Sequence, residues 1–279
     1  MSILFRGFTL AALMALAYPA MSAPAASTRL YALDCGRARF ADMGMFADTG
    51  EYDGKPGSIV DPCFVIVHPH GTLLWDTGLG DDLVGKDRIE GNGAITLHVD
   101  TSLVAQLQTL KLTPDDITFV GFSHLHFDHT GNANRFMHST WLINRTELQA
   151  ALSDSPPFGV DPKLISNHQS VQLQQIDGDF DVFGDGTVRI LKAPGHTPGH
   201  QVLLVKLAHA GPVLLSGDLY HTRENRSQRR VPGINTDRAD TLASFDRIEH
   251  IVANQHARVI VQHDPRDFAS LPHFPAFLD

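Results

Sequence analysis

The chain has only two cysteines among its 279 residues, which excludes a disulfide-rich scaffold and a zinc site built from four cysteines. It also lacks an excess of positive charge, since 22 lysines and arginines stand against 31 aspartates and glutamates. A general nucleic-acid-binding protein is therefore not expected, because contact with phosphates requires a basic surface. Beyond the N-terminus, no stretch of 18 uncharged apolar residues indicates a transmembrane helix.

The composition is otherwise that of a protein with an ordinary core, with 43% hydrophobic and 19% charged residues. The unusual feature is the number of histidines, which is 16. Histidine titrates near neutral pH and is the commonest metal ligand in proteins. The positions of these histidines along the chain are therefore the first guide to function.

Residues 1–23 have the pattern of an export signal. Arg6 is the only charge, residues 7–17 form an apolar run too short to span a bilayer, and small residues follow. We expect cleavage within residues 22–26, a single domain over 24–279, and a periplasmic or secreted protein without stable membrane association. The alternative is a segment that stays attached as a membrane anchor.

Export would place Cys35 and Cys63 in an oxidising compartment, where a disulfide can form. Both cysteines lie in apolar, strand-like segments, and two buried thiols are an equally good interpretation. The sequence does not fix the distance between them.

Segments typical of strands and helices alternate throughout residues 30–261, with no repeat and no low-complexity linker. This order predicts two sheets with helices outside, an α/β architecture. The best helix covers residues 235–254, where apolar side chains recur at helical spacing. Residues 79–98 and 153–170 are loop-like. The expected strands cover residues 63–67, 72–75, 118–122, 141–143, 188–192, 201–207, 213–216 and 258–261.

Four potential metal ligands lie within six residues after the apolar strand 118–122. His124 and His126 would point to one side of an extended segment, and a turn after Phe127 would direct Asp128 and His129 elsewhere. Packing gives no reason for four adjacent imidazole and carboxylate groups. Because the ligands point in two directions, the pattern indicates two metal ions.

Three more strands each end close to a single candidate ligand: His196, Asp218 and His263. A lone histidine at a strand end is more often a packed or solvated residue, but a coordination shell that starts at His124 needs ligands from elsewhere. Five histidines and two aspartates suit zinc or a similar divalent metal.

The segments Ser123-His-Leu-His-Phe-Asp-His-Thr-Gly-Asn132, Ala193-Pro-Gly-His-Thr-Pro-Gly-His200, Gly217-Asp218 and Gln262-His263-Asp264 resemble, in this order, the metal motifs of the metallo-β-lactamase superfamily. The resemblance covers about residues 30–279 and implies an αβ/βα four-layer sandwich with a dinuclear metal site. Within the superfamily the chain is most similar to exported N-acyl-homoserine lactonases, to judge from residues 127–134, 217–225 and 261–264.

The resemblance also assigns roles to single residues. It implies two divalent metal ions, with zinc as the expected metal, and Asp76 as an aspartate that orients ligands. His200 would pack or form hydrogen bonds near the site. The first ion would be held by His124, His126 and His196, the second by Asp128, His129 and His263, and Asp218 would bridge both.

The expected reaction is opening of a small-molecule acyl lactone by a metal-bridging hydroxide. The oxygen that leaves when the ring opens needs a proton, and the motif places Asp128 close to it. Many lactonases that this chain resembles have a tyrosine three residues after the bridging aspartate, where this chain has His221. His221 is therefore a candidate general acid, and a solvent-facing loop residue is the alternative.

Two further segments allow two interpretations each. The apolar side chains Met43, Met45 and Phe46 could line a groove for an acyl chain, or form a core edge or the contact of a homodimer. The arginines at positions 223, 226, 229 and 230 could grip an anion, but a solvated or salt-bridged loop is expected in an acidic protein.

The metal ligands alone do not discriminate among hydrolases. A β-lactamase, a thioesterase and an organophosphate or aryl esterase could use the same site. A protein of another class, a metal-bearing binding module without catalysis, is disfavoured because the set of seven ligands is complete.

Overall fold

The computed structural model describes residues 27–279. The predicted export signal and its cleavage region, residues 1–26, lie outside the described residues. Two sheets and six α-helices make up the described chain, with short 3-10 turns between them.

The strands are β1 Arg29–Phe40, β2 Gly57–His68, β3 Gly71–Trp75, β4 Asp87–Glu90, β5 Ile95–His98, β6 Phe119–Gly121, β7 Thr140–Asn144, β8 Gln172–Ile176, β9 Phe180–Asp181, β10 Val188–Lys192, β11 Gln201–Leu207, β12 Gly211–Leu215 and β13 Arg258–Ile260. The helices are α1 Leu103–Thr109, α2 Phe127–Thr130, α3 Arg145–Ala151, α4 Arg223–Gln228, α5 Arg238–Gln255 and α6 Pro265–Phe268.

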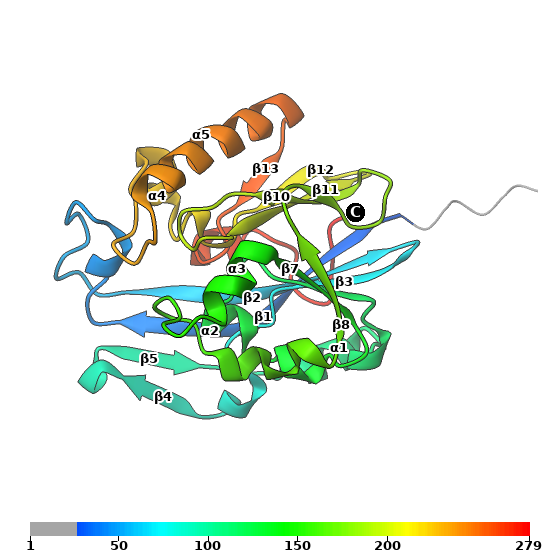
Figure 1. Cartoon of the computed structure of the whole chain (residues 1–279), viewed down its shortest axis with the longest axis horizontal. Coiled ribbons are helices and arrows are strands. Elements are labelled where there is room, and N and C mark those ends of the chain that lie inside the picture. Colours follow the sequence, from blue (N-terminus) through cyan, green and yellow to red (C-terminus); the bar gives the residue numbers. More distant parts are fainter. Residues whose placement is uncertain (1–26) are drawn as a thin grey trace, which may run out of the picture.

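The larger sheet has the strand order β4-β5-β1-β2-β3-β6-β7-β8, and the smaller has the order β13-β12-β11-β10-β9. Strands β3, β6, β7 and β8 are parallel neighbours, as are β12 and β13. The two sheets lie face to face, and in Figure 1 α5 lies outside the smaller sheet. Helices α1 and α3 pack against the other face of the larger sheet. The predicted αβ/βα four-layer sandwich is confirmed.

Apolar residues from both sheets form the central core. Phe64 and Trp75 of the larger sheet cluster with Ile190 and Leu203 of the smaller sheet, and all four side chains are fully buried. A second cluster packs the larger sheet against α1 and α3, and a third packs the smaller sheet against α5. Each sheet therefore buries both faces, which explains why its central strands are continuous apolar runs.

This architecture brings the carboxyl ends of several strands to one edge of the sandwich. The segments after β6, β10, β12 and β13 carry His124, His196, Asp218 and His263. A glycine is required in the turn before His196, because Gly195 has a φ of +131° and a Cβ atom there would lie 2.3 Å from the backbone nitrogen of Thr241.

The expectation of a loop over residues 79–98 was wrong. Residues 87–98 form the antiparallel hairpin β4–β5, which pairs with β1 through β5. The sequence signal is weak because β4 is polar and lies at the sheet edge. Residues 153–170 are a loop that ends in the 3-10 segment Pro162–Gln169.

The arginine-rich segment is a helix, not the expected loop. Thr222 caps α4 through a hydrogen bond from the backbone N–H of Asn225. The expected salt bridges are present: Arg223 pairs with Asp267, Arg226 with Glu249, Arg229 with Asp246 and Arg230 with Glu51.

The structure pairs Cys35 and Cys63 in a buried disulfide between β1 and β2. Of the two interpretations of these cysteines, the disulfide is the one observed. Among residues 27–279, no helix is both long enough and apolar enough to cross a membrane.

Replacing both cysteines by serine is expected to lower the free energy of unfolding by about 3–4 kcal/mol, because the disulfide closes a loop in the unfolded chain. The two cysteines are 28 residues apart. Urea unfolding of the wild type with and without reductant, beside the double variant, measures the effect. Equal stability of all three samples would contradict it.

Candidate metal centre

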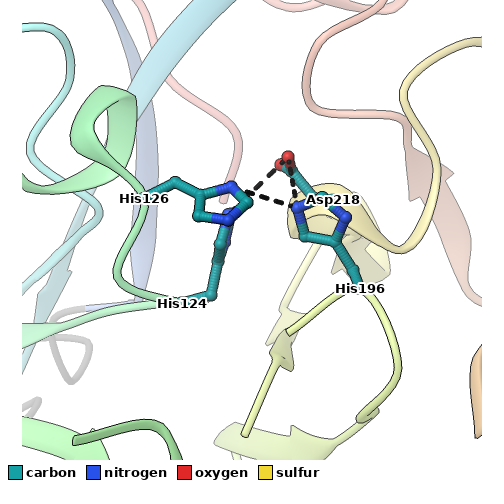
Figure 2. A group of neighbouring side chains, drawn as sticks. All are labelled: His124, His126, His196 and Asp218. Atoms are coloured by element: carbon teal, nitrogen blue, oxygen red, sulfur yellow. Dashed lines mark hydrogen bonds and ion pairs between the residues drawn. The ribbon is translucent and has the colours of Figure 1, made fainter. Parts of the chain in front are cut away.

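The first group of potential ligands consists of His124, His126, His196 and Asp218. One ligand atom from each lies within 4.8 Å of all the others, and all four residues are buried. Figure 2 shows the imidazoles and the carboxylate directed toward one another, with His196 and Asp218 facing the two histidines that follow β6. The Nδ1 atom of His126 lies 3.2 Å from Nε2 of His196.

The second group consists of Asp61, Asp128, His129 and His263, again with ligand atoms within 4.8 Å of one another. The Nε2 atoms of His129 and His263 are 3.2 Å apart. Asp128 and His129 lie on α2, which begins directly after the extended segment with His124 and His126. This helix turns the two pairs in different directions, as the spacing suggested. Asp61 is not among the ligands predicted from the sequence.

The Asp218 carboxylate lies between the two groups. Its Oδ2 atom is 3.2 Å from Nε2 of His196 and 3.7 Å from Nε2 of His124. Its Oδ1 atom is 2.8 Å from Nε2 of His263 and 3.1 Å from Nε2 of His129. One oxygen therefore faces each group, which is the arrangement that a carboxylate shared between two cations requires.

Hydrogen bonds behind the imidazoles fix their orientation. Asp76 accepts one from Nδ1 of His129 at 2.9 Å and one from the backbone N–H of Ser123 at 2.7 Å. The Nδ1 atom of His263 donates to the carbonyl oxygen of Val60 at 2.7 Å. Both rings are thereby held with Nε2 directed into the site, as metal-binding histidines usually are.

Glu147 on α3 connects the two histidine-bearing loops. Its carboxylate accepts hydrogen bonds from the backbone N–H of Leu125 at 3.0 Å and of Gly199 at 2.8 Å. Leu125 lies between His124 and His126, and Gly199 precedes His200. Glu147 has no motif spacing to the histidines, so the sequence carries no signal for this role.

His200 does not belong to either group of ligands. Its Nδ1 donates to the carbonyl oxygen of Ala193 at 3.0 Å, and its Nε2 accepts from the backbone N–H of Asp218 at 2.9 Å. Burial and the neighbouring His196 lower the pKa of His200 to about 3. The neutral ring therefore positions the loop that carries Asp218.

The two groups differ in their electrostatics. Burial lowers the pKa of His124 and His126 well below the usual value, and neighbouring imidazoles lower it further. Burial alone would also lower the pKa of His263, but the Asp218 carboxylate raises it to about 9. For Asp218 itself, burial favours a higher pKa, yet the surrounding imidazoles hold it well below the usual range.

His221 is buried beside the centre, so it is not a solvent-facing loop residue. Its Nε2 atom lies 3.0 Å from Oδ2 of Asp218, and its ring centroid lies 4.9 Å from that of Phe46. The Nδ1 atom of His221 is buried and has no hydrogen-bond partner among residues 27–279.

A cavity of about 440 Å³ reaches His126 and His196. Phe158, which is 71% exposed, and Ile234 supply apolar surface in its lining. Of the apolar loop after β1, Met43 is buried in a core cluster, as in the core-edge interpretation. Phe46 contacts His221, and the Met45 carbonyl accepts a hydrogen bond from Gly233 of the cavity lining.

The donor set suits divalent cations. Two closely packed groups of imidazoles and carboxylates, without thiolate, are ligands that zinc and similar metals accept. Buried donor atoms are also left without partners among residues 27–279, including Nε2 of His124 and both carboxylate oxygens of Asp61. Bound cations would satisfy these atoms, which packing alone leaves unpaired.

A family description of the metallo-beta-lactamase superfamily matches residues 61–263. The chain is 30% identical over 261 residues to the N-acyl homoserine lactonase AttM of Azorhizobium caulinodans, with 90% of this chain and 98% of the relative covered.

Solved structures agree with this match. One is an N-acyl homoserine lactone hydrolase with the product N-hexanoyl-L-homoserine bound at its catalytic metal centre, with a TM-score of 0.78, 28% identity, and coverage of 90% of this chain and 99% of that one. The dizinc quorum-quenching lactonase AidC has the same fold at 19% identity and a TM-score of 0.66, with 90% and 89% covered. With its sandwich fold and ligands from four strand ends, the chain belongs to the metallo-β-lactamase superfamily.

Proposed function

We propose that the protein is a metal-dependent hydrolase that opens the lactone ring of N-acyl-homoserine lactones. The observation that carries the proposal is Asp218, which directs one carboxylate oxygen at each of two ligand groups. The similarity to lactonases over 90% of the chain supports this substrate class.

The residues of each group have a defined task in this reaction. His124, His126 and His196 would hold one cation, Asp128, His129 and His263 the other, and Asp218 would bridge them. Such a pair supplies Lewis acidity and lowers the pKa of water from 15.7 to about 7. Zinc is the metal we propose, because imidazole and carboxylate donors at buried, fixed positions suit it.

Hydrolysis adds hydroxide to the acyl carbon and breaks its bond to the ring oxygen, which leaves as an alkoxide and takes up a proton to become the alcohol. We assign this proton transfer to His221, whose imidazole is buried next to the carboxylate between the two groups. Burial lowers the pKa of His221, and the nearby Asp218 carboxylate, which favours the protonated imidazole, offsets this effect only in part. Asp128 is the other candidate, with Oδ1 4.0 Å from Nε2 of His129.

The acyl chain of the substrate requires apolar surface next to the site. We assign it to the cavity beside His126 and His196, where Phe158 and Ile234 are available. In the loop after β1, Met45 is joined to the cavity lining by its hydrogen bond with Gly233, and Phe46 contacts His221 beside the centre. Met43 would not touch the substrate, because its side chain packs against Gly57 within the core.

We also propose that the mature protein is exported, as residues 1–23 predict. The Cys35–Cys63 disulfide supports this proposal, because disulfides persist in oxidising compartments and are rare in the cytosol. A homodimer remains a prediction from sequence.

Purified protein is expected to convert acyl-homoserine lactones with C4 to C12 chains into products heavier by one water. Mass spectrometry of the product, beside a His126→Ala control that lacks a ligand of the first group, measures the reaction. Penicillins, thioesters and paraoxon form the comparison panel. Turnover of one of these without lactone opening would identify another hydrolase, and no turnover by metal-loaded protein would favour a binding module.

His221→Phe is expected to lower kcat for the lactone by about 100-fold or more, the usual contribution of a general acid, with metal content unchanged. His221→Tyr introduces the residue found in similar lactonases and should restore much of the rate. His138→Phe, at a 74% exposed side chain, is the matched control. Wild-type kcat in His221→Phe would remove His221 from the mechanism.

Expression of the full chain in a Gram-negative host should yield periplasmic or secreted protein whose first residue lies between positions 23 and 27. Cell fractionation followed by N-terminal sequencing tests this outcome. Cytoplasmic protein that starts at Met1 would contradict export, and membrane-bound protein that starts there would establish the anchor.

A further inference from the structure

We propose that Asp61 is an additional protein ligand of the second cation. The site that binds through Asp128, His129 and His263 would then have two carboxylates and two imidazoles of its own, besides the shared Asp218. The first site has three imidazoles and no carboxylate of its own. The proposal concerns the metal centre and does not depend on which substrate the protein hydrolyses.

Strand β2 brings Asp61 to the centre. The preceding residue, Val60, exchanges two hydrogen bonds with His263: its carbonyl oxygen accepts from Nδ1 at 2.7 Å, and its N–H donates to the His263 carbonyl oxygen at 3.1 Å. Strand β2 is therefore held against the segment that carries His263. Asp61 is only 3% exposed, and one of its oxygens lies within 4.8 Å of the ligand atoms of the other three residues.

The Asp61 carboxylate has no other explanation within the described chain. Neither of its oxygens has a hydrogen-bond partner among residues 27–279, although both are buried. Burying an ionised carboxylate without a donor or a counter-charge is strongly unfavourable. Its neighbour Asp128 adds a like charge, and the imidazoles of His129 and His263 offset burial and this repulsion only in part. A divalent cation between the two carboxylates would satisfy both groups.

The extra ligand would make the two sites chemically unequal. Imidazoles suit zinc, whereas carboxylate oxygens suit harder cations such as Mn²⁺. The four positive charges of two divalent cations would be partly neutralised by three carboxylates, those of Asp61, Asp128 and Asp218. The second site should therefore hold its cation more firmly than a site with one carboxylate, and it should accept manganese more readily than the first.

The test is the isosteric substitution Asp61→Asn, measured by metal binding. Metal-free protein is titrated with Zn²⁺ and, separately, Co²⁺ in competition with a chromophoric chelator. The wild type should bind two ions. In Asp61→Asn the affinity of one of the two sites should fall by about 100-fold or more, beyond the usual effect of losing a partner behind a ligand, while the other site stays unchanged. The visible Co²⁺ spectrum should lose the contribution of one site only.

Asp34→Asn is the matched control. Asp34 lies on β1 opposite Pro62, is half-buried, and accepts a hydrogen bond from Gly36 that asparagine retains. Its variant should bind both ions as the wild type does. If both variants lose affinity for metal, the loss arises from disturbance of the β1–β2 strand pair, and the proposal is overturned.

If Asp61→Asn binds two ions with wild-type affinity, the proposal is also overturned, since Asp61 would then lie near the site without binding a cation. If this variant does not fold, a crystal structure of the zinc-loaded wild type decides. Anomalous scattering should place a zinc ion about 2.0–2.2 Å from an Asp61 oxygen. A separation beyond about 3 Å would refute ligation, whatever the lactonase assay shows.

Discussion

The buried Asp218 carboxylate is the interaction on which the rest of the site depends. Four imidazoles approach its two oxygens from the ends of three strands, and a fifth, His221, approaches from the next turn. A negative charge at this depth is stable only with positive charge close by. The sandwich supplies that environment, because the carboxyl ends of strands from both sheets meet at one edge and exclude solvent from it.

The parts of the centre that are contiguous in sequence could be predicted from it. The segment from His124 to His129 follows an apolar strand. Its spacing directs the side chains of the first two ligands and those of the last two toward different metal sites, so local geometry alone assigns them. Asp61 could not be found this way, because a single aspartate inside a strand has no spacing to any other ligand. Its role arises only when β2 packs against the segment that follows β13, about 200 residues later.

In the fold, too, local patterns could be predicted from the sequence and features that depend on distant contacts could not. The central strands were predictable because burial on both faces makes them continuously apolar. The β4–β5 hairpin was missed because the edge strand β4 is mostly polar and β5 has only four residues. Helix α4 was missed because its stability comes from a cap and from ion pairs to distant acids. In both cases tertiary contacts, which the local pattern does not record, decide the conformation.

Glu147 has a consequence for the order of assembly. Through hydrogen bonds to Leu125 and Gly199, one carboxylate joins loops that belong to different sheets. The imidazoles of the first group are thus preorganised before any ion arrives, and little conformational entropy is lost on uptake. The free-energy cost of bringing these ligands together is met during folding and not during metal binding. The metal-free centre should therefore have the same shape as the metal-bound one.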